Sequence, residues 1–140
     1  MSRQISVEGV LLPNKPLTNF DIRDAAKKLR IGNFRGVFQR DMLPKKFQKK
    51  ECGILNLGDS WGGGSHWTVW FKNGDEKFYF DSFGVQPPLE LIDYLKPDIF
   101  YNTEEIQPRY QVFCGHLCLY VLNMQLMQGK GLQQVINDLY

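Results

Sequence analysis

The sequence predicts an α+β fold in which strands in the middle of the chain form a sheet and helices lie around it. Three features predict this arrangement. Short β-prone runs lie between residues 34 and 81, helical periodicities precede and follow them, and Pro or Gly clusters separate the segments. Because no repeat or low-complexity linker interrupts the 140 residues, we expect one domain over residues 1–140. The role of residues 1–17 stays open.

The first predicted helix spans about residues 19–30. Thr18 and Asp21 have the spacing of a capping box, which marks a helix start. Gly32 is suited to ending the helix. Apolar residues recur at helical spacing and should share one buried face: Phe20, Ile22, Ala25, Ala26 and Leu29.

Short strands should follow the first helix, over about residues 34–39 and 53–57. The second of these is mostly apolar, as expected of a buried strand. Two more short strands are expected at 99–101 and 105–107.

Further helices are expected in the second half of the chain. One should begin at the two prolines 87–88 and end before Pro97, since Pro suits a helix start and cannot continue a helix. Two more should cover about 114–128 and 132–140, with a break at Gly-Lys-Gly.

The most informative stretch is a pair of aromatic-rich runs on either side of Asn73-Gly74. Asn-Gly between two such runs favours a two-residue hairpin loop of type I′. With that loop Lys72 faces Asp75, and stepping outward places His66 opposite Asp81 on one face of the hairpin. A four-residue loop would make them diagonal neighbours. The opposite face should enter the core: Trp67, Val69, Phe71, Phe78 and Phe80.

A histidine beside a carboxylate supplies the base and the orienting group of a nucleophilic triad. Cys114 is the candidate nucleophile, because it precedes Gly115 and opens the helix predicted over 114–128. Unpaired N–H groups and the positive end of the helix dipole favour a thiolate there. We interpret Cys118 as a small core residue.

Zinc is an alternative use of the cysteines and histidines. On a helix, however, the spacing Cys-x-His-x-Cys directs its middle residue about 200° away from the outer two. We therefore expect no metal site. Three cysteines in a chain that begins without a recognisable signal peptide also argue against a disulfide framework.

The charge is unevenly distributed. Residues 1–50 contain twelve Lys and Arg against four Asp and Glu, whereas residues 51–140 contain five against eleven. The basic run that holds Lys45, Lys46, Lys49 and Lys50 could contact nucleic acid or form an ordinary solvated loop. Because dedicated DNA-binding domains usually have a pI above about 9 and this chain has 8.4, we expect only weak binding.

Several motifs together resemble the adenain-like (adenovirus-type) maturation cysteine proteases and, more distantly, the SUMO and Nedd8 proteases of the same clan. They are His66-Trp67, the run from Tyr79 to Gly84 around Asp81, and Gln107 followed seven residues later by Cys114-Gly115. The order His, acid, Gln, Cys, with Trp after His and Gly after Cys, is highly specific. The seven-residue separation and the short chain favour the viral branch found in virophages and Polinton-type elements. Asp81 stands where the adenovirus enzymes carry Glu.

The resemblance implies a papain-like or adenain-like fold, with a central mixed sheet flanked by helices. It also implies a cysteine endopeptidase in which His66 is the general base, Asp81 orients it and Gln107 donates to the oxyanion. Without the resemblance, Gln107 would be interpreted as an exposed loop amide. The Gly-rich loop before His66 is either a cleft-mouth element, whose missing side chains let a substrate backbone approach closely, or a plain connection. The candidate substrate-binding residues are Gly63, Gly64, Ser65 and Trp67.

The implied substrates are viral capsid or core precursors, cleaved after Gly or another small residue. No cofactor is needed for the chemistry, although DNA or an activating peptide could assist. We expect a monomer without a membrane partner, in the virion and in the host-cell cytoplasm or nucleus, and not secreted. Two alternatives stay open: a deconjugating protease for a SUMO- or ubiquitin-like modifier, and a non-catalytic nucleic-acid-binding module.

Overall fold

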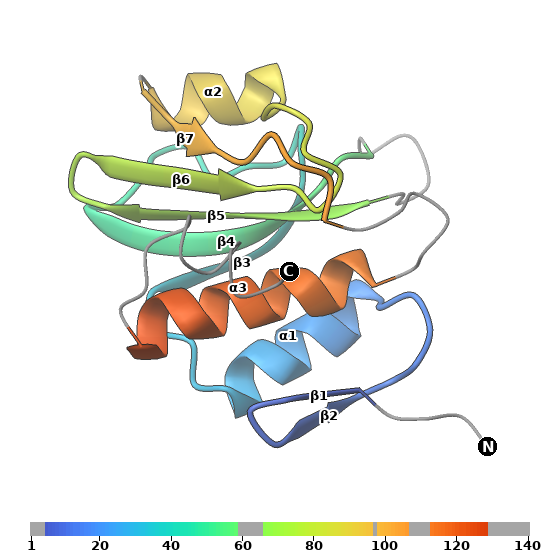
Figure 1. Ribbon diagram of the computed structural model, residues 1–140. Helices are drawn as coiled ribbons and strands as arrows, with labels where there is room; N and C mark the ends of the chain where they lie inside the picture. Colours follow the sequence, from blue (N-terminus) through green and yellow to red (C-terminus); the bar gives the residue numbers. More distant parts are fainter. Residues whose placement is uncertain (1–4, 59–65, 97, 107–112, 129–140) are drawn as a thin grey trace.

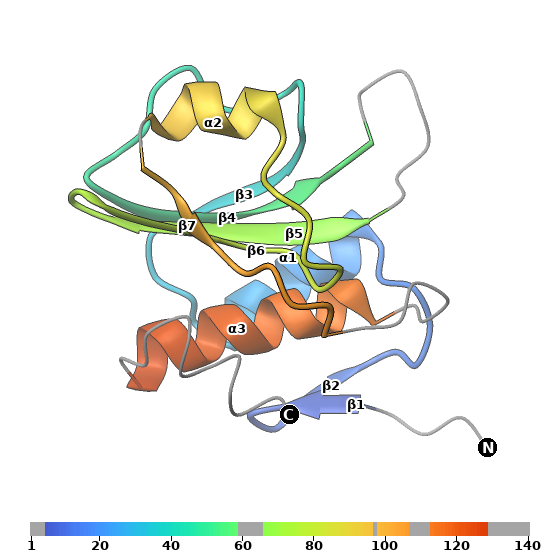
Figure 2. The ribbon, with the colours of Figure 1, turned by 45° about the horizontal axis from the view of Figure 1, so that its top comes forward.

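The computed structural model describes residues 5–58, 66–96, 98–106 and 113–128 of the chain. A five-stranded mixed sheet forms its centre, with α1 and α3 on one face and α2 on the other (Figure 1). A separate two-stranded hairpin lies beyond α1 and α3 (Figure 2). The predicted α+β class is confirmed. Within the described ranges, no helix is long and apolar enough to cross a membrane.

The strands of the large sheet lie in the order β3-β4-β5-β6-β7. The inner pairs β4–β5 and β5–β6 are antiparallel, whereas β3–β4 and β6–β7 are parallel. Their bounds are Phe34–Gln39 for β3, Lys50–Asn56 for β4, Trp67–Asn73 for β5, Glu76–Phe80 for β6 and Phe100–Tyr101 for β7. The strands expected at 34–39, 53–57 and 99–101 are thus present, β4 starting three residues earlier. Residues 105 and 106 form no strand, and Gln107 lies outside the described residues.

The turn between β5 and β6 is one residue further along the chain than the sequence predicted. Asn73 pairs with Glu76, so the loop residues are Gly74 and Asp75. Only Gly74 has a positive φ, 63°, which suits a type II′ turn with Gly first. The pairing therefore moves by two positions, and the register of β5 and β6 makes His66 and Asp81 diagonal neighbours.

A shift of two positions keeps every side chain on its predicted face. Val69 pairs with Phe80, and Phe71 with Phe78, on the face covered by α1 and α3. Residues of the opposite face pack under α2: Leu55, Trp70, Tyr79, Leu91 and Leu95. The predicted aromatic core is therefore confirmed.

Helix α1 spans Asn19–Lys28 and begins with the predicted capping box between Thr18 and Asp21. It ends differently from the prediction. Arg30 takes a positive φ of 57°, and the Ile31 N–H donates to the Ala26 carbonyl at 3.1 Å. This is a Schellman end, so the chain leaves the helix before Gly32. Phe20 is 76% exposed and does not join the buried face.

Helix α2 spans Leu89–Leu95 and buries Leu91 and Leu95, whereas Leu89 faces solvent. Helix α3 spans Cys114–Gln128, as the sequence predicted. The helix expected over 132–140 lies outside the described residues.

The hairpin in the first seventeen residues was not predicted. Strands β1, Ile5–Val7, and β2, Val10–Leu12, are joined by two residues with positive φ, Glu8 at 46° and Gly9 at 81°. Two positive φ values define a type I′ turn, for which Glu is an unusual first residue. The hairpin buries Val7 and Leu12 in the core that contains α1 and α3.

Candidate active site

His66 and Asp81 form a buried pair at one end of the sheet. His66 immediately precedes β5 and Asp81 immediately follows β6. The His66 Nε2 lies 2.5 Å from the Asp81 Oδ1, and both side chains are almost fully buried. The diagonal placement therefore still allows the predicted hydrogen bond, because both residues lie at strand ends where the chain can bend.

Cys114 is the first residue of α3, and its thiol lies beside this pair. The backbone N–H of Trp67 donates to the Cys114 Sγ at 3.5 Å. Since Trp67 follows His66 in the chain, this contact holds the sulfur next to the histidine. Asp81 occupies His66 Nε2, so Nδ1 is the ring nitrogen left to interact with the thiol. The structure thus brings together His66, Asp81 and Cys114.

The electrostatics of this trio favour a thiolate–imidazolium pair. Burial alone would lower the pKa of His66, but the hydrogen bond to Asp81 and the interaction with Cys114 outweigh it and raise the pKa to about 9. Burial alone would raise the pKa of the Cys114 thiol. The His66 interaction and the N–H groups of Trp67 and Gly115 outweigh burial, so the pKa of Cys114 is lowered. Such a sulfur can attack an electrophilic carbonyl carbon near neutral pH.

Asn102, just beyond β7, holds the main chain of Asp81. Its Oδ1 accepts from the Asp81 N–H at 3.0 Å, and its Nδ2 donates to the Asp81 carbonyl at 2.6 Å. The amide is buried, so these bonds fix where the carboxylate can lie. Sequence reasoning missed Asn102, because no local pattern indicates a partner twenty-one residues away.

Phe83 was also missed. Its ring stacks on the His66 imidazole, with centroids 3.9 Å apart and planes 5° from parallel. Its backbone N–H donates to the Asp81 Oδ1 at 2.9 Å. The face of an aromatic ring attracts a cation, so Phe83 stabilises the imidazolium form and also shields it from water.

The turn that carries Asp81 and Phe83 packs against the segment after β7. Gly84 has φ 73°, and a Cβ there would lie 2.7 Å from the Thr103 carbonyl oxygen. The Ile106 N–H donates to the Ser82 carbonyl at 2.8 Å. Asp81 therefore lies on a turn that requires glycine at position 84. The segment after β7 contacts this turn at Gly84 and at Ser82.

The other cysteines do not join the site. Burial, followed by the charge of Glu51, raises the pKa of Cys52 to about 12. Burial likewise raises the pKa of Cys118 well above its usual value, and Cys118 packs in the core, as expected. The described residues hold no group of three or more His, Cys, Asp and Glu arranged for a metal ion.

The remaining predicted site residues have different outcomes. Gln107, Gly63, Gly64 and Ser65 lie outside the described residues. Trp67 is described, and its indole N–H donates to the Leu17 carbonyl at 2.9 Å. The tryptophan side chain therefore packs against the segment after β2.

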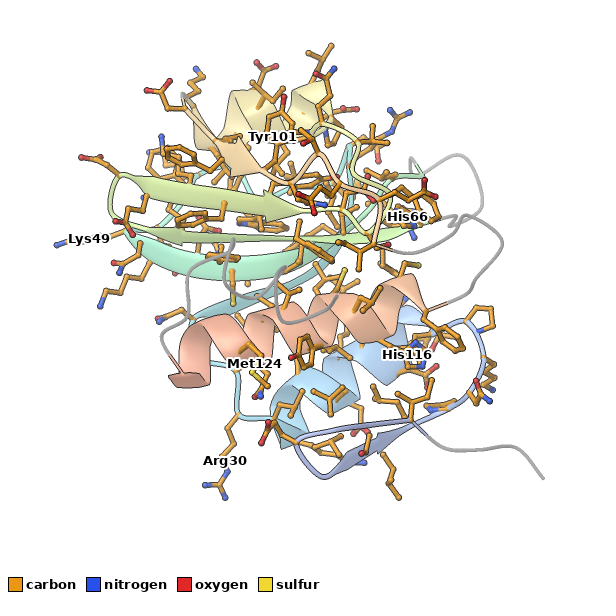
Figure 3. The ribbon with its side chains drawn as sticks, in the orientation of Figure 1. Arg30, Lys49, His66, Tyr101, His116 and Met124 are labelled. Carbon is orange, nitrogen blue, oxygen red and sulfur yellow. The ribbon has the colours of Figure 1, made fainter. Side chains whose placement is uncertain are left out.

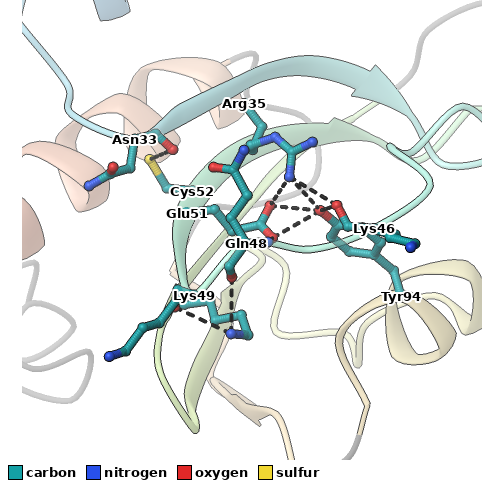
Figure 4. Close-up of polar contacts among 9 residues, drawn as sticks. Asn33, Arg35, Lys46, Gln48, Lys49, Glu51, Cys52 and Tyr94 are labelled. Carbon is teal, nitrogen blue, oxygen red and sulfur yellow. Dashed lines mark hydrogen bonds and ion pairs between the residues drawn. The ribbon is translucent and has the colours of Figure 1, made fainter.

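The four candidate lysines lie between β3 and β4 and at the start of β4, and all four are exposed. The loop is anchored by its main chain (Figure 4). Arg35 donates to the Lys46 carbonyl at 3.1 Å, and Lys72 donates to the carbonyls of Gln48 and Lys49 at 3.0 and 3.3 Å.

A buried carboxylate completes this anchor. Glu51 accepts from the Tyr94 hydroxyl at 2.8 Å and from the Gln48 N–H at 2.9 Å. Burial, followed by the hydrogen bond to Glu51, raises the pKa of Tyr94. These hydrogen bonds hold the main chain of the loop, while the four lysine side chains are exposed.

No protein-family model matches the sequence, and no curated protein does. Among solved structures, the chain is similar to the crystal structure of the ASFV pS273R protease. The TM-score is 0.61 at 19% sequence identity, over 88% of this chain and 61% of that chain. The chain therefore has the same fold as that protease.

The selenomethionine form of the ASFV pS273R protease gives a TM-score of 0.59 at 20% identity, over 88% of this chain and 62% of that one. The expected cysteine-protease fold, a central mixed sheet flanked by helices, is thereby confirmed. The chain spans about three fifths of the length of the ASFV protease.

Proposed function

We propose that the chain is a cysteine endopeptidase of the adenain-like clan. The observation that carries this proposal is the trio of Cys114, His66 and Asp81, with a lowered pKa at the thiol and a raised pKa at the imidazole. Similarity to the fold of a protease supports it. If these residues had only a structural role, a buried, positively charged histidine beside a cysteine would not be needed.

The geometry supports a two-step acyl transfer. The Cys114 thiolate attacks the peptide carbonyl carbon, and the C–N bond breaks as the His66 imidazolium gives its proton to the departing amine. Water then attacks the thioester carbon while His66 takes a proton from it, and the C–S bond breaks, which releases the acid and restores the thiolate–imidazolium pair. Throughout, Asp81 holds the ring through Nε2 and stabilises its charge.

The oxyanion of each step needs donors. The backbone N–H of Cys114, at the start of α3, is one candidate, because helix N-termini carry unpaired N–H groups. We propose the side-chain amide of Gln107 as the second, on the resemblance to the clan. A Gln107→Ala variant should then lose kcat by roughly 100- to 1000-fold with a smaller effect on KM.

As substrates we propose viral capsid or core precursors, cleaved after Gly or another small residue, at the site of virus assembly. The similarity to the ASFV pS273R protease and the resemblance to the viral branch of the clan support this choice. A peptide library tests the cleavage rule: enrichment of Gly at the cleaved position supports it, and enrichment of a basic or aromatic residue contradicts it.

Modifier deconjugation is the competing activity. An unstructured precursor peptide and a folded ubiquitin-like modifier with a C-terminal extension, compared at equal concentration, separate the two. We expect the peptide to be cleaved with the higher kcat/KM. Preference for the folded modifier would replace the maturation proposal.

We further propose that the lysine loop binds DNA weakly and without sequence preference. Two observations support this. All four lysine side chains are exposed, and Arg35 and Lys72 hold the loop backbone by hydrogen bonds to its carbonyls. Replacing all four by Gln should weaken DNA binding and reduce the slope of log K against log salt. Unchanged affinity in that variant would contradict the proposal, and peptide cleavage with and without DNA shows whether binding affects catalysis.

A further inference from the structure

The segment after β2, residues 13–17, contacts residues that neighbour Cys114 and His66 in the chain. The Leu17 carbonyl accepts the indole N–H of Trp67 at 2.9 Å. The Pro13 carbonyl accepts the Nε2–H of His116 at 2.7 Å. In Figure 3, His116 lies on the side of α3 that faces this segment, and His66 lies at the nearby end of the sheet. Two hydrogen bonds thus connect this short segment to β5, which follows His66, and to α3, which begins at Cys114.

Leu17 contacts the residue that follows each reactive residue. Trp67 follows His66, and its backbone N–H also donates to the Cys114 Sγ. Gly115 follows Cys114, and a Cβ there would lie 3.1 Å from the Leu17 Cδ1 and 3.2 Å from the Trp67 Cδ1. Leu17 and Trp67 therefore leave little room for a side chain at Gly115, and in a close-packed interior we expect a displacement of Leu17 to move the start of α3 relative to β5.

The position of Leu17 is itself fixed on both sides. Thr18, the next residue, caps α1. On the other side, the buried ring of His116 donates to the Pro13 carbonyl, and burial lowers the pKa of His116. Further back, Val7 and Leu12 anchor the hairpin in the core.

We propose that Leu17 is a positioning residue that sets the alignment of the Cys114 thiol with His66, with residues 13–17 acting as a fixed support for that pair. Its consequence for peptide cleavage rests on the proposed endopeptidase function. Its consequence for thiol reactivity does not, because alkylation of Cys114 needs no peptide substrate.

The test compares Leu17→Ala with Leu12→Ala in the full chain. Both leucines belong to the same core and are 4% and 3% exposed, so the two variants lose the same atoms from similar surroundings. Leu17 contacts Gly115 and Trp67, whereas Leu12 lies in β2 and pairs with Ile5 of β1. The readouts are the alkylation rate of Cys114 by iodoacetamide as a function of pH, the thermal midpoint, and kcat and KM on a peptide.

We expect Leu17→Ala to move the alkylation profile of Cys114 to higher pH and to lower kcat by about tenfold or more at little change in KM, since misplacing reacting groups by about 1 Å costs on the order of 100-fold. Leu12→Ala should lower the thermal midpoint but keep the alkylation profile. Leu17→Met, which conserves volume, should restore most of the reactivity.

Identical alkylation profiles for the two alanine variants, measured on folded protein, would overturn the proposal and make Leu17 an ordinary core residue. If Leu17→Ala does not fold, Leu17→Val gives the same comparison with a smaller loss, against Leu12→Val. A wild-type chain that cleaves no peptide but alkylates readily at low pH would contradict the endopeptidase function, while the alkylation comparison would still decide the role of Leu17.

Discussion

Phe83 lies flat on the imidazole of His66, with the two ring centroids 3.9 Å apart. Because an aromatic face stabilises a cation, replacing Phe83 by Leu should lower the pKa of His66 and thus move the alkaline limit of kcat/KM to lower pH. The measurement is the pH profile of peptide cleavage for the two proteins. An unchanged profile with reduced stability would mean that Phe83 only fills space.

Asp81 stabilises the positive charge of His66, so it should set the upper pH limit of activity. In the wild-type chain the pKa of His66 is raised to about 9, so the imidazolium, and with it the reactive ion pair, should persist up to that pH. Asp81→Asn removes the charge that favours protonation, so the limit should fall and the rate at neutral pH should drop. Asp81→Glu keeps the charge and should retain more activity than Asp81→Asn; equal loss in both would show that the turn accepts only the shorter side chain.

Asn102 should matter because it clamps the main chain of Asp81 at both its N–H and its carbonyl. Replacing it by Ala leaves the buried Asp81 N–H without this partner, while the Asp81 carbonyl keeps the Gly84 N–H. The change should destabilise the fold by about 1–3 kcal/mol and lower kcat more than it raises KM. Denaturant unfolding and peptide kinetics measure the two effects. Asn123→Ala is the matched control, since Asn123 is a buried amide whose Nδ2 has no hydrogen-bond partner in the described part of the chain. A loss of kcat as large as that of Asn102→Ala would contradict a specific role for Asn102.

Among the glycines that the structure describes, Gly53 has the least room for a side chain. A Cβ there would lie 2.3 Å from the Trp70 ring, which occupies the paired position on β5. Gly53→Ala should therefore destabilise strongly, by roughly 1–3 kcal/mol or more, because the ring must move within a packed core. Adding Trp70→Leu should offset part of this loss in a double-mutant cycle. Gly32→Ala, where a Cβ meets nothing within 4 Å, should cost little; similar losses at both glycines would contradict the steric argument.

Much of the fold and the His66–Asp81 pair could be predicted, because they depend on local signals. Cys114 was grouped with this pair from its position at a helix start and from the family resemblance. The capping box at Thr18, the helix start at Cys114 and the alternation along β5 and β6 each depend on neighbours a few residues away. The register error at Gly74 had no effect on the faces, since the pairing moved by two positions. It would have reversed them with a shift of one.

The rest depends on contacts between distant segments. Asn102 reaches Asp81 across twenty-one positions, and Leu17 reaches Trp67 across fifty. Neither residue differs in its local sequence from an ordinary loop amide or a core leucine. The hairpin before Leu17 was missed for another reason: Glu8 adopts a positive φ of 46°, which a non-glycine residue seldom does.

The central claim, that Cys114 is an activated nucleophile, is tested most directly by alkylation and cleavage in Cys114→Ala and Cys118→Ala. With one equivalent of iodoacetamide near neutral pH, mass spectrometry of the wild-type chain should find the label on Cys114, since burial raises the pKa of both other thiols. Labelling should end peptide cleavage. Cys114→Ala should remain folded, take up no rapid label and cleave nothing, whereas Cys118→Ala should label and cleave like the wild type. Normal cleavage by Cys114→Ala, or rapid labelling of Cys118 in its place, would contradict the account.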